Sequence, residues 1–336
     1  MPDSSLVALI IIIILAIGFG LVNGFNDAAN AMAASVGSRA ISPRNAIILA
    51  SVMNMFGALS GVAVAKTIGK GILTEDVILQ FEYIPVIAAL GAVIVWGSLA
   101  TWMGLPVSIS HSFVTGLAAA GIALVGTDAV VWSKMAKVGA SVGIAPVLGF
   151  IGGFALMVII LWLFRRSSPA GMRTIFSRAQ WLTTAFLAYS HGKNDGQMPI
   201  GVITLALVIH TSNTGLWDNI PLWIIIVSAL AISSGTLIGG WRVIKTLGMK
   251  VTALRPVHGF VADFSAGVVI EVASQLGIPV STTHCAASAV MGIGATRRLS
   301  AVRWGVAGNI VTAWILTFPI CGALGYVFTK LLQLLY

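Results

Sequence analysis

A pair of polar motifs occurs twice in this chain, once in each half, inside long apolar stretches. The first copy is Gly24-Phe25-Asn26-Asp27-Ala28-Ala29-Asn30, followed later by Pro106-Val107-Ser108-Ile109-Ser110-His111. The second is Gly192-Lys193-Asn194-Asp195-Gly196, followed at nearly the same distance by Pro279-Val280-Ser281-Thr282-Thr283-His284. An Asn-Asp pair at membrane depth is costly unless it binds an ion or a hydrogen-bonding ligand. Its duplication predicts one polar site built from two related halves.

The apolar stretches around the motifs are long enough to cross a membrane, which takes about 20 residues per helix. Of the 336 residues, 58% are hydrophobic and only 9% are charged, more apolar surface than a soluble protein of this length could cover. The N-terminal apolar run lacks a basic region and a small-residue cleavage site, so we interpret it as a first membrane segment. The sequence predicts an all-α polytopic protein of the lipid bilayer.

The basic residues cluster in loops and predict the orientation of the chain. Thirteen of the 19 Lys and Arg residues lie in loops 39–44, 165–178, 242–255 and 297–303. The positive-inside rule places these loops in the cytoplasm. Loops 66–83, 128–138 and 211–219 are then external. This distribution accounts for the net charge of +9, so no nucleic-acid partner is expected.

Five segments in each half connect these loops. They lie at about 5–38, 45–64, 85–103, 105–127, 139–164, 181–210, 220–240, 256–275, 277–296 and 304–335. An odd number of crossings turns the second half over relative to the first, which predicts an inverted-topology repeat with both termini outside.

The predicted units are a first membrane repeat at 1–164, a short cytoplasmic linker at 165–180 and a second, inverted repeat at 181–336. The first, fifth and last segments are too long for one straight helix. We therefore expect broken helices and re-entrant or half-helix elements, with about 10–12 transmembrane segments in total.

Each Asn-Asp element predicts a helix break and a cation site. Gly lowers helix stability by about 1 kcal/mol relative to Ala, and Asn and Asp compete for backbone hydrogen bonds. A break at mid-membrane is tolerated where the freed groups line a polar cavity. Carboxylate and amide oxygens there suit sodium, with predicted ligands Asn26, Asp27, Asn194 and Asp195 and a further side-chain carbonyl from Asn30. The alternative is that each pair only bonds neighbouring helices together.

The Pro-Val-Ser-x-[Ser/Thr]-His elements predict helix starts, because Pro favours a first turn and Ser or Thr caps it. Free amides and the helix dipole make such a terminus an anion site, and two that face each other would enclose a tetrahedral oxyanion. The predicted binding groups are Ser108, Ser110, His111, Ser112, Ser281, Thr282 and Thr283. The alternative is two ordinary capped helices whose His111 and His284 bond a backbone carbonyl.

At these residues the chain resembles the inorganic phosphate transporter (PiT) family. Gly24 to Ala31, His191 to Asp195 and the two Pro-Val-Ser-x-[Ser/Thr]-His elements are similar to the duplicated signatures of that family, and the resemblance covers nearly the whole chain. It implies a cation-coupled, often sodium-dependent, phosphate symporter whose sites are the Asn-Asp and Ser/Thr positions above, with Asn30 among the phosphate-binding residues.

The chain also departs from the family pattern. Met198 stands where the second copy would match Asn30, so the two cation sites need not be equivalent. The loop at 165–178 is short compared with the cytoplasmic insert of animal members, so regulation through it is not expected.

Three charged residues in apolar segments of the second half have no counterpart in the first. Lys193 replaces Phe25, Asp263 lies where the match is Leu90, and Glu271 lies where the match is Ser98. Each is expected to pair with another buried charge. Lys193 is also a candidate for attracting phosphate. For Glu271 the alternatives are a structural hydrogen bond and an additional sodium site.

These features predict a secondary transporter that takes up inorganic phosphate by symport with sodium, at the plasma membrane and by alternating access. The alternatives are a proton-coupled or metal-phosphate symporter and a transporter of another oxyanion such as sulfate. A serine hydrolase is disfavoured because catalysis needs one nucleophile and not a duplicated constellation. No nucleotide-binding loop occurs, and no cofactor besides the coupling ions is expected. A homo-oligomer is compatible with the sequence.

Overall fold

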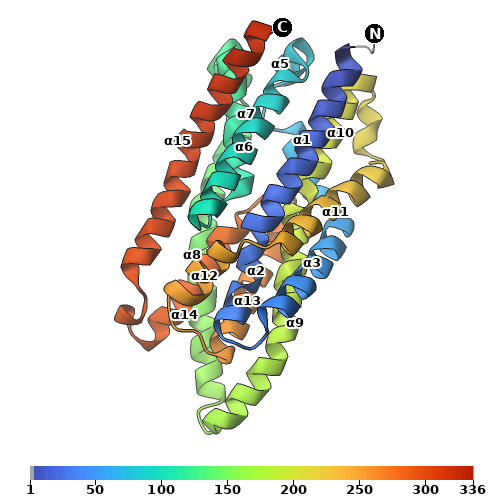
Figure 1. The fold of residues 1–336 in the computed structure, drawn as a ribbon. Helices are drawn as coiled ribbons and strands as arrows, with labels where there is room; N and C mark the ends of the chain where they lie inside the picture. The colour runs from blue at the N-terminus through green and yellow to red at the C-terminus, as the bar shows by residue number, and fades with distance from the viewer. Residues whose placement is uncertain (1–3, 336) are drawn as a thin grey trace.

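The computed structural model describes residues 4–335, which are almost entirely helical (Figure 1). Within that range the only β pairing is an isolated bridge between Leu73 and Val130. This confirms the predicted all-α fold class. The helices are α1 (Ser4–Asn26), α2 (Ala28–Gly37), α3 (Pro43–Leu59), α4 (Ala63–Lys70), α5 (Glu75–Phe81), α6 (Ile84–Met103), α7 (Ile109–Val125), α8 (Trp132–Leu163), α9 (Pro169–Asp195), α10 (Gln197–Thr211), α11 (Leu222–Ile238), α12 (Trp241–Lys245), the π-helical η3 (Thr246–Lys250), α13 (Pro256–Gln275), α14 (Thr282–Arg297) and α15 (Trp304–Leu335).

Long apolar helices form the frame of the molecule. Among the described residues five are long and apolar enough to cross a membrane, or seven if each of two bent helix pairs is one span. α7 and α14 have only 17 and 16 residues, fewer than the roughly 20 that a span needs. They are the half-helix elements that the sequence predicts. The five spans are Ser5–Gly37, Ile84–Met103, Trp132–Leu163, Pro256–Gln275 and Trp304–Leu335.

The sharp bends lie elsewhere than the sequence predicted. α3 and α4 meet at 72° and α11 and α12 at 61°, at the C-terminal ends of the segments expected at about 45–64 and 220–240. Gly61 lies at the first bend, and Gly239, with φ +71°, lies at the second. A glycine can take such a left-handed conformation without a clash, and it ends the helix there.

Two predicted breaks are absent. The fifth and last segments were expected to be broken, yet α8 and α15 each run unbroken for 32 residues. Each contains one proline, Pro146 and Pro319. Membrane helices tolerate such prolines because neighbouring groups can satisfy the freed carbonyls.

Each Asn-Asp element coincides with a one-residue interruption of its helix, and not with the full helix break that the sequence predicts. α1 ends at Asn26 and α2 begins at Ala28, while α9 ends at Asp195 and α10 begins at Gln197. The interruption is slight, because Asp27 keeps helical dihedral angles (φ −80°, ψ −37°) and its amide bonds to the carbonyl of Asn23 at 2.8 Å. The chain therefore continues in nearly the same direction through the motif.

α7 and α14 begin inside the Pro-Val-Ser-x-[Ser/Thr]-His elements, as predicted. Ser108 caps α7 by accepting a hydrogen bond from the amide of His111 at 3.2 Å, and Ser281 caps α14 by accepting one from His284 at 3.1 Å. The prolines do not lie in the first turn as expected. Each stands two residues before its capping serine, where it keeps the chain extended in front of the helix.

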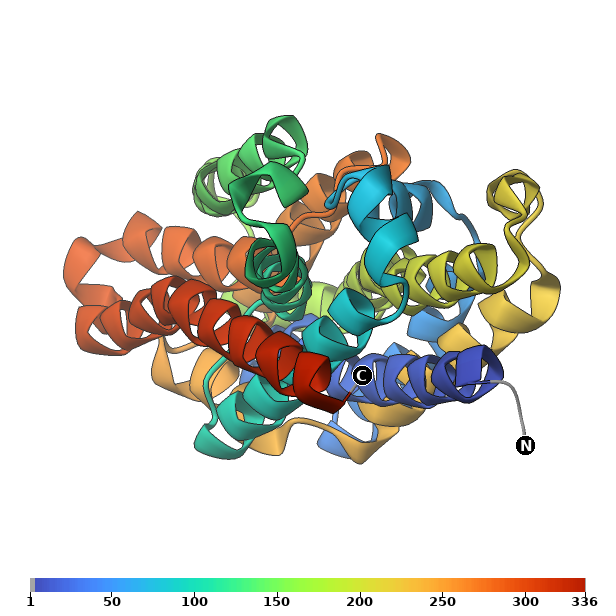
Figure 2. The same ribbon diagram turned by 90° about the horizontal axis from the view of Figure 1, so that it is seen from above.

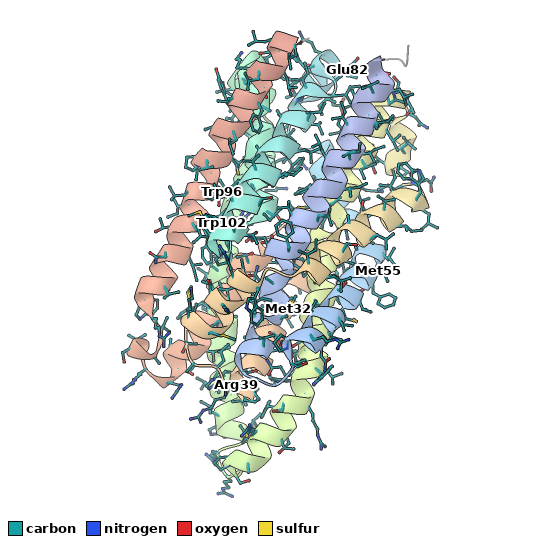
Figure 3. All side chains as sticks on the ribbon, in the orientation of Figure 1. Met32, Arg39, Met55, Glu82, Trp96 and Trp102 are labelled. Carbon is teal, nitrogen blue, oxygen red and sulfur yellow. The ribbon has the colours of Figure 1, made fainter. Side chains whose placement is uncertain are left out.

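Both termini lie at the same end of the molecule. The N and C marks are at the top of Figure 1 and face the viewer in Figure 2, which is the view from above. Arg39 lies toward the opposite end (Figure 3), as does the connection between α8 and α9. α1 runs away from the terminal end, whereas α9 runs back toward it.

Glycines in the two motifs let helices cross in backbone contact. A Cβ atom at Gly24 in α1 would lie 2.1 Å from the carbonyl oxygen of Ile232 in α11. A Cβ atom at Gly192 in α9 would lie 2.1 Å from the carbonyl oxygen of Asn54 in α3. Small residues allow membrane helices to pack this closely. Each glycine lies two residues before the asparagine of its Asn-Asp pair, so the crossings position the polar motifs.

We predict that Gly24→Ala destabilises the protein although Ala is the better helix former by about 1 kcal/mol. The added methyl group would collide with α11, and overpacking of this kind lowers the free energy of unfolding by about 1–3 kcal/mol. Thermal unfolding in detergent measures the effect. The control is Gly143→Ala in α8, where an added Cβ has no neighbour within 4 Å. Equal thermal unfolding midpoints for the two variants would contradict the backbone contact between α1 and α11.

Candidate functional site

The two motif carboxylates meet at one buried place between the halves. Asp27 and Asp195 are 1% and 0% exposed. Together with His191 they offer ligand atoms that all lie within 4.8 Å of one another. Two negative charges at that separation repel by about 3 kcal/mol at an effective dielectric constant of about 20. The site is therefore one that a cation, or a proton, would stabilise.

Hydroxyl groups from the two helix starts donate to these carboxylates. Thr283 Oγ1 donates to Asp27 Oδ1 at 2.7 Å. On the other carboxylate, Thr282 Oγ1 donates to Asp195 Oδ2 at 2.8 Å and Ser110 Oγ to Asp195 Oδ1 at 3.1 Å. The start of α14 thus reaches Asp27 in the first half, while the start of α7 reaches Asp195 in the second. The groups predicted to bind the anion and those predicted to bind the cation thus form a single cluster.

The amide of Ile109, at the start of α7, adds a backbone donor to the cluster. It bonds to Asp27 Oδ2 at 3.3 Å. This is the expected chemistry of a helix N-terminus, whose first amides have no partner within the helix. A carboxylate occupies the position that the sequence assigned to an oxyanion.

The motif asparagines divide into two groups. Asn194 Nδ2 donates to Ser274 Oγ at 3.0 Å and to the carbonyl of Ile278 at 3.3 Å, which ties the end of α9 to the segment before α14. In the first half, the side-chain amide of Asn26 lies 2.6 Å from Thr101 Oγ1 and ties the end of α1 to α6 in the same way. These two side chains hold the helix starts in place, which is the structural role that the alternative interpretation assigned to them.

Asn30 belongs directly to the cluster. Its Nδ2 donates to Thr283 Oγ1 at 2.5 Å, while its Oδ1 is buried without a partner in the described part of the chain. Asn194 Oδ1 is likewise buried and unpartnered there. Because a buried carbonyl oxygen without a donor is costly, both oxygens are candidate ligands for a cation.

Three of the predicted hydroxyls form hydrogen bonds within their own helix start. Ser108 and Ser281 accept from the cap amides described above, and Ser112 Oγ donates to the carbonyl of Ser108 at 2.7 Å. They shape the helix starts, whereas Ser110, Thr282 and Thr283 point to the carboxylates.

The two motif histidines lie next to each other beside the cluster. Their rings lie 5.4 Å apart between centroids, and that of His284 lies 4.0 Å from the ring of Trp314. His111 Nε2 lies 3.4 Å from Ser141 Oγ. Neither ring nitrogen of His284 has a partner among residues 4–335. The backbone-carbonyl partners that the alternative interpretation expected are therefore absent from the described residues.

The matches with known proteins agree with this geometry. The model of a family described as the phosphate transporter family matches residues 23–173 and 166–325. The chain belongs to the phosphate transporter family. It is 39% identical over 334 residues to a protein of Bacillus subtilis (strain 168) named as a low-affinity inorganic phosphate transporter, with 99% of this chain and 100% of that protein covered.

Other members of the phosphate transporter family are also similar over most of their length. A protein of Rhizobium meliloti (strain 1021) with the same designation is 38% identical over 310 residues, covering 92% of this chain and 91% of that protein. A solved structure titled "The sodium-dependent phosphate transporter" superposes with a TM-score of 0.89 at 28% identity, covering 98% of this chain and 100% of that chain. The chain is thus a multi-pass membrane transporter of phosphate and not an enzyme.

Lys193 and Glu271 do not join the central cluster of this phosphate transporter. They form an ion pair with each other, and Gln275 Nε2 donates to the same Glu271 oxygen at 3.0 Å. Asp263 accepts a hydrogen bond from Thr184 Oγ1 at 2.7 Å. The pairing expected of buried charges therefore holds for Lys193 and Glu271. For Asp263 the described partner is a hydroxyl.

Sequence reasoning missed two residues of the site. His191 Nε2 lies 3.1 Å from Asp195 Oδ2, and its Nδ1 lies 2.8 Å from Asn54 Oδ1. Asn23, at the equivalent position before Asp27, is buried with both amide atoms unpartnered in the described chain. The available signal was their spacing, since a polar residue four positions before each aspartate lies on the same helix face.

Proposed function

We propose that this chain takes up inorganic phosphate by symport with sodium ions, through alternating access around the central cluster. The observation that carries the proposal is the meeting of Asp27 and Asp195 with the hydroxyl groups of two helix starts. The sodium-dependent phosphate transporter of similar structure adds support.

We assign the cations to the carboxylates and the nearby amide oxygens. Asp27 and Asp195 supply negative charge, and the unpartnered oxygens of Asn30 and Asn194 supply neutral ligands. Hard oxygen ligands of this kind suit sodium. Sodium at the carboxylates would also remove the mutual repulsion that otherwise opposes their burial.

Phosphate binding then follows because a cation and three hydroxyl groups compete for the same carboxylate oxygens. Ser110, Thr282 and Thr283 donate to carboxylate oxygens that a cation would also contact. A bound cation would weaken those hydrogen bonds and free the hydroxyls, with the helix N-termini, to donate to an oxyanion. Sodium binding would in this way prepare the phosphate site, which is the basis of coupling.

We also propose that the two halves are inverted repeats, at 1–164 and 181–336, joined by a linker at 165–180. The opposite directions of α1 and α9 support this assignment, as do the equivalent ties of Asn26 to Thr101 and Asn194 to Ser274. With the basic loops in the cytoplasm, both termini face the outside of the plasma membrane.

Neutralising either carboxylate tests the sodium coupling. Asp27→Asn and Asp195→Asn keep size but remove the charge that holds a cation, so each should lower sodium-driven phosphate uptake into proteoliposomes at least about tenfold, the equivalent of 1.4 kcal/mol. The exposed Asp218, which pairs with Lys66 at 3.8 Å, gives the control variant Asp218→Asn.

Sodium and proton gradients should be imposed side by side in the same assay. Wild-type uptake driven by protons without sodium would favour the proton-coupled alternative. Sulfate uptake at an equal rate would favour a general oxyanion transporter. Full activity of an Asp→Asn variant with unchanged sodium dependence would remove that residue from the cation site.

Removing the bridging hydroxyls tests the phosphate site. Ser110→Ala and Thr283→Ala should each weaken phosphate binding by about 1.5–3 kcal/mol, since each deletes a hydrogen bond to a charged group. Because both would contact one ligand, their effects should be coupled in the double variant. Calorimetry at saturating sodium provides the measurement.

The control for the hydroxyl variants is Thr204→Ala, which removes a buried hydroxyl that bonds to the carbonyl of Ile200 within α10. It should bind phosphate like the wild type. Wild-type affinity in both Ser110→Ala and Thr283→Ala would move the anion to another place.

Cysteine labelling tests the inversion. In a variant with Cys285→Ala and Cys321→Ala, single cysteines in the basic loops should resist a membrane-impermeant thiol reagent in intact cells, and those in the external loops should react. Labelling on opposite sides at positions 42 and 168 would make the repeat parallel. The protected positions are Ser42, Ser168 and Lys250, and the reactive positions are Thr74 and Ser212.

A further inference from the structure

An apolar cavity of about 490 Å³ lies between α8, α14 and α15. Its walls include Pro146, Phe150, Met291, Trp314 and Phe318, and Ser288 carries the only hydroxyl group among its lining residues. The volume falls within the range of about 300–1,000 Å³ that is typical of small-molecule sites. A cavity with so little polarity does not bind water well, so its natural occupant is a hydrocarbon chain.

The mouth of this cavity faces the bilayer. α8 and α15 are both candidate membrane spans. On its rim, Val147, Ile151 and Ile315 are 54%, 57% and 64% exposed. α15 also packs against α6 and α7. Lipid chains in the membrane therefore have direct access to the cavity.

The inner wall is a single aromatic layer that touches the transport site. The indole of Trp314 donates to the carbonyl of Pro106 at 3.0 Å, and its ring lies in close, tilted contact with that of His284. The ring of Phe318 lies 5.8 Å from that of His111. An occupant of the cavity would thus contact the residues that hold the starts of α7 and α14.

Positive charge lies beyond one end of the cavity. Arg297 and Arg298 end α14, and Arg303 directly precedes α15. At about 1.5 Å per helical residue, Arg298 lies roughly 10 Å along α14 from Met291. All three arginines are exposed, and none of them forms an ion pair with another described residue. Each basic residue near a membrane surface attracts anionic lipid by about 1 kcal/mol.

We propose that an anionic phospholipid of the bilayer binds here, with one acyl chain in the cavity and its headgroup at Arg297, Arg298 and Arg303. The chain fills an apolar space that opens toward lipid, and the headgroup meets arginine charge that no described carboxylate neutralises. The bound chain lies one aromatic layer away from the phosphate transport site.

Photolabelling tests the acyl chain. The full protein is reconstituted in vesicles that contain phosphatidylglycerol with a photoreactive group on one acyl chain, and adducts are mapped by mass spectrometry. Adducts should concentrate at cavity residues of α8 and α15. They should fall about tenfold, the equivalent of 1.4 kcal/mol, in Ile315→Trp, which fills the mouth.

Leu316→Trp is the matched control, because Leu316 is 45% exposed but does not line the cavity. It should keep wild-type labelling. Val147→Trp fills the same mouth from α8 and should reduce labelling like Ile315→Trp. Because the two substitutions lie in different helices, a folding defect in one variant would not decide the result. Adducts spread evenly over the lipid-facing helices, or unchanged in both filling variants, would overturn the site. Cross-links there to a second copy of the chain would do the same.

The headgroup is tested with a lipid comparison. Arg297→Gln combined with Arg298→Gln should reduce labelling by the phosphatidylglycerol probe about tenfold and leave labelling by a phosphatidylcholine probe unchanged. Arg165→Gln with Arg166→Gln, at the connection of α8 and α9, is the control and should alter neither. Equal labelling of the wild type by the two probes would overturn the choice of an anionic lipid.

Discussion

Two carboxylates buried against each other are the constraint on which the rest of this structure depends. Asp27 and Asp195 are almost fully excluded from solvent and lie close enough to repel strongly. They are held by donors from Ser110, Thr282 and Thr283, and these donors exist only because α7 and α14 begin beside them. The half-helices, the extended segments before them and the glycine crossings all serve to bring these groups together.

The hydrogen bonds of the cluster cross between the halves. The first-half carboxylate is bound by a second-half hydroxyl, and the second-half carboxylate by hydroxyls of both halves. Neither half can therefore form the site alone. This arrangement explains why the motifs come in pairs, and it makes the centre sensitive to any movement of one half against the other.

The two halves are nevertheless chemically unequal. His191 stands beside Asp195, whereas Asn23 holds the equivalent place before Asp27. Asn30 bonds to Thr283, but its counterpart is the apolar Met198. The ion pair of Lys193 and Glu271 occurs only in the second half, where the matching residues of the first are Phe25 and Ser98. The carboxylates of the cluster thus have different surroundings, and their affinities for a cation should differ.

The sequence by itself determined the membrane class, the helix starts, the positions of the Asn-Asp interruptions and the family, because each of these depends on local composition or on short motifs. Apolar runs must be helical in lipid, and a capping serine acts on an amide three residues away. Such signals need no knowledge of distant contacts. They also identified Asp27, Asp195, Ser110, Thr282 and Thr283 as polar groups that require a partner.

Only the tertiary structure decided which partner each group has. It brought predicted anion and cation residues into one cluster, assigned Asn26 and Asn194 to holding the helix starts, and paired Lys193 with Glu271. It also bent the chain at Gly61 and Gly239 while leaving α8 and α15 continuous. These outcomes depend on contacts between segments far apart in the chain, since packing against neighbours determines whether a proline or glycine interrupts a membrane helix.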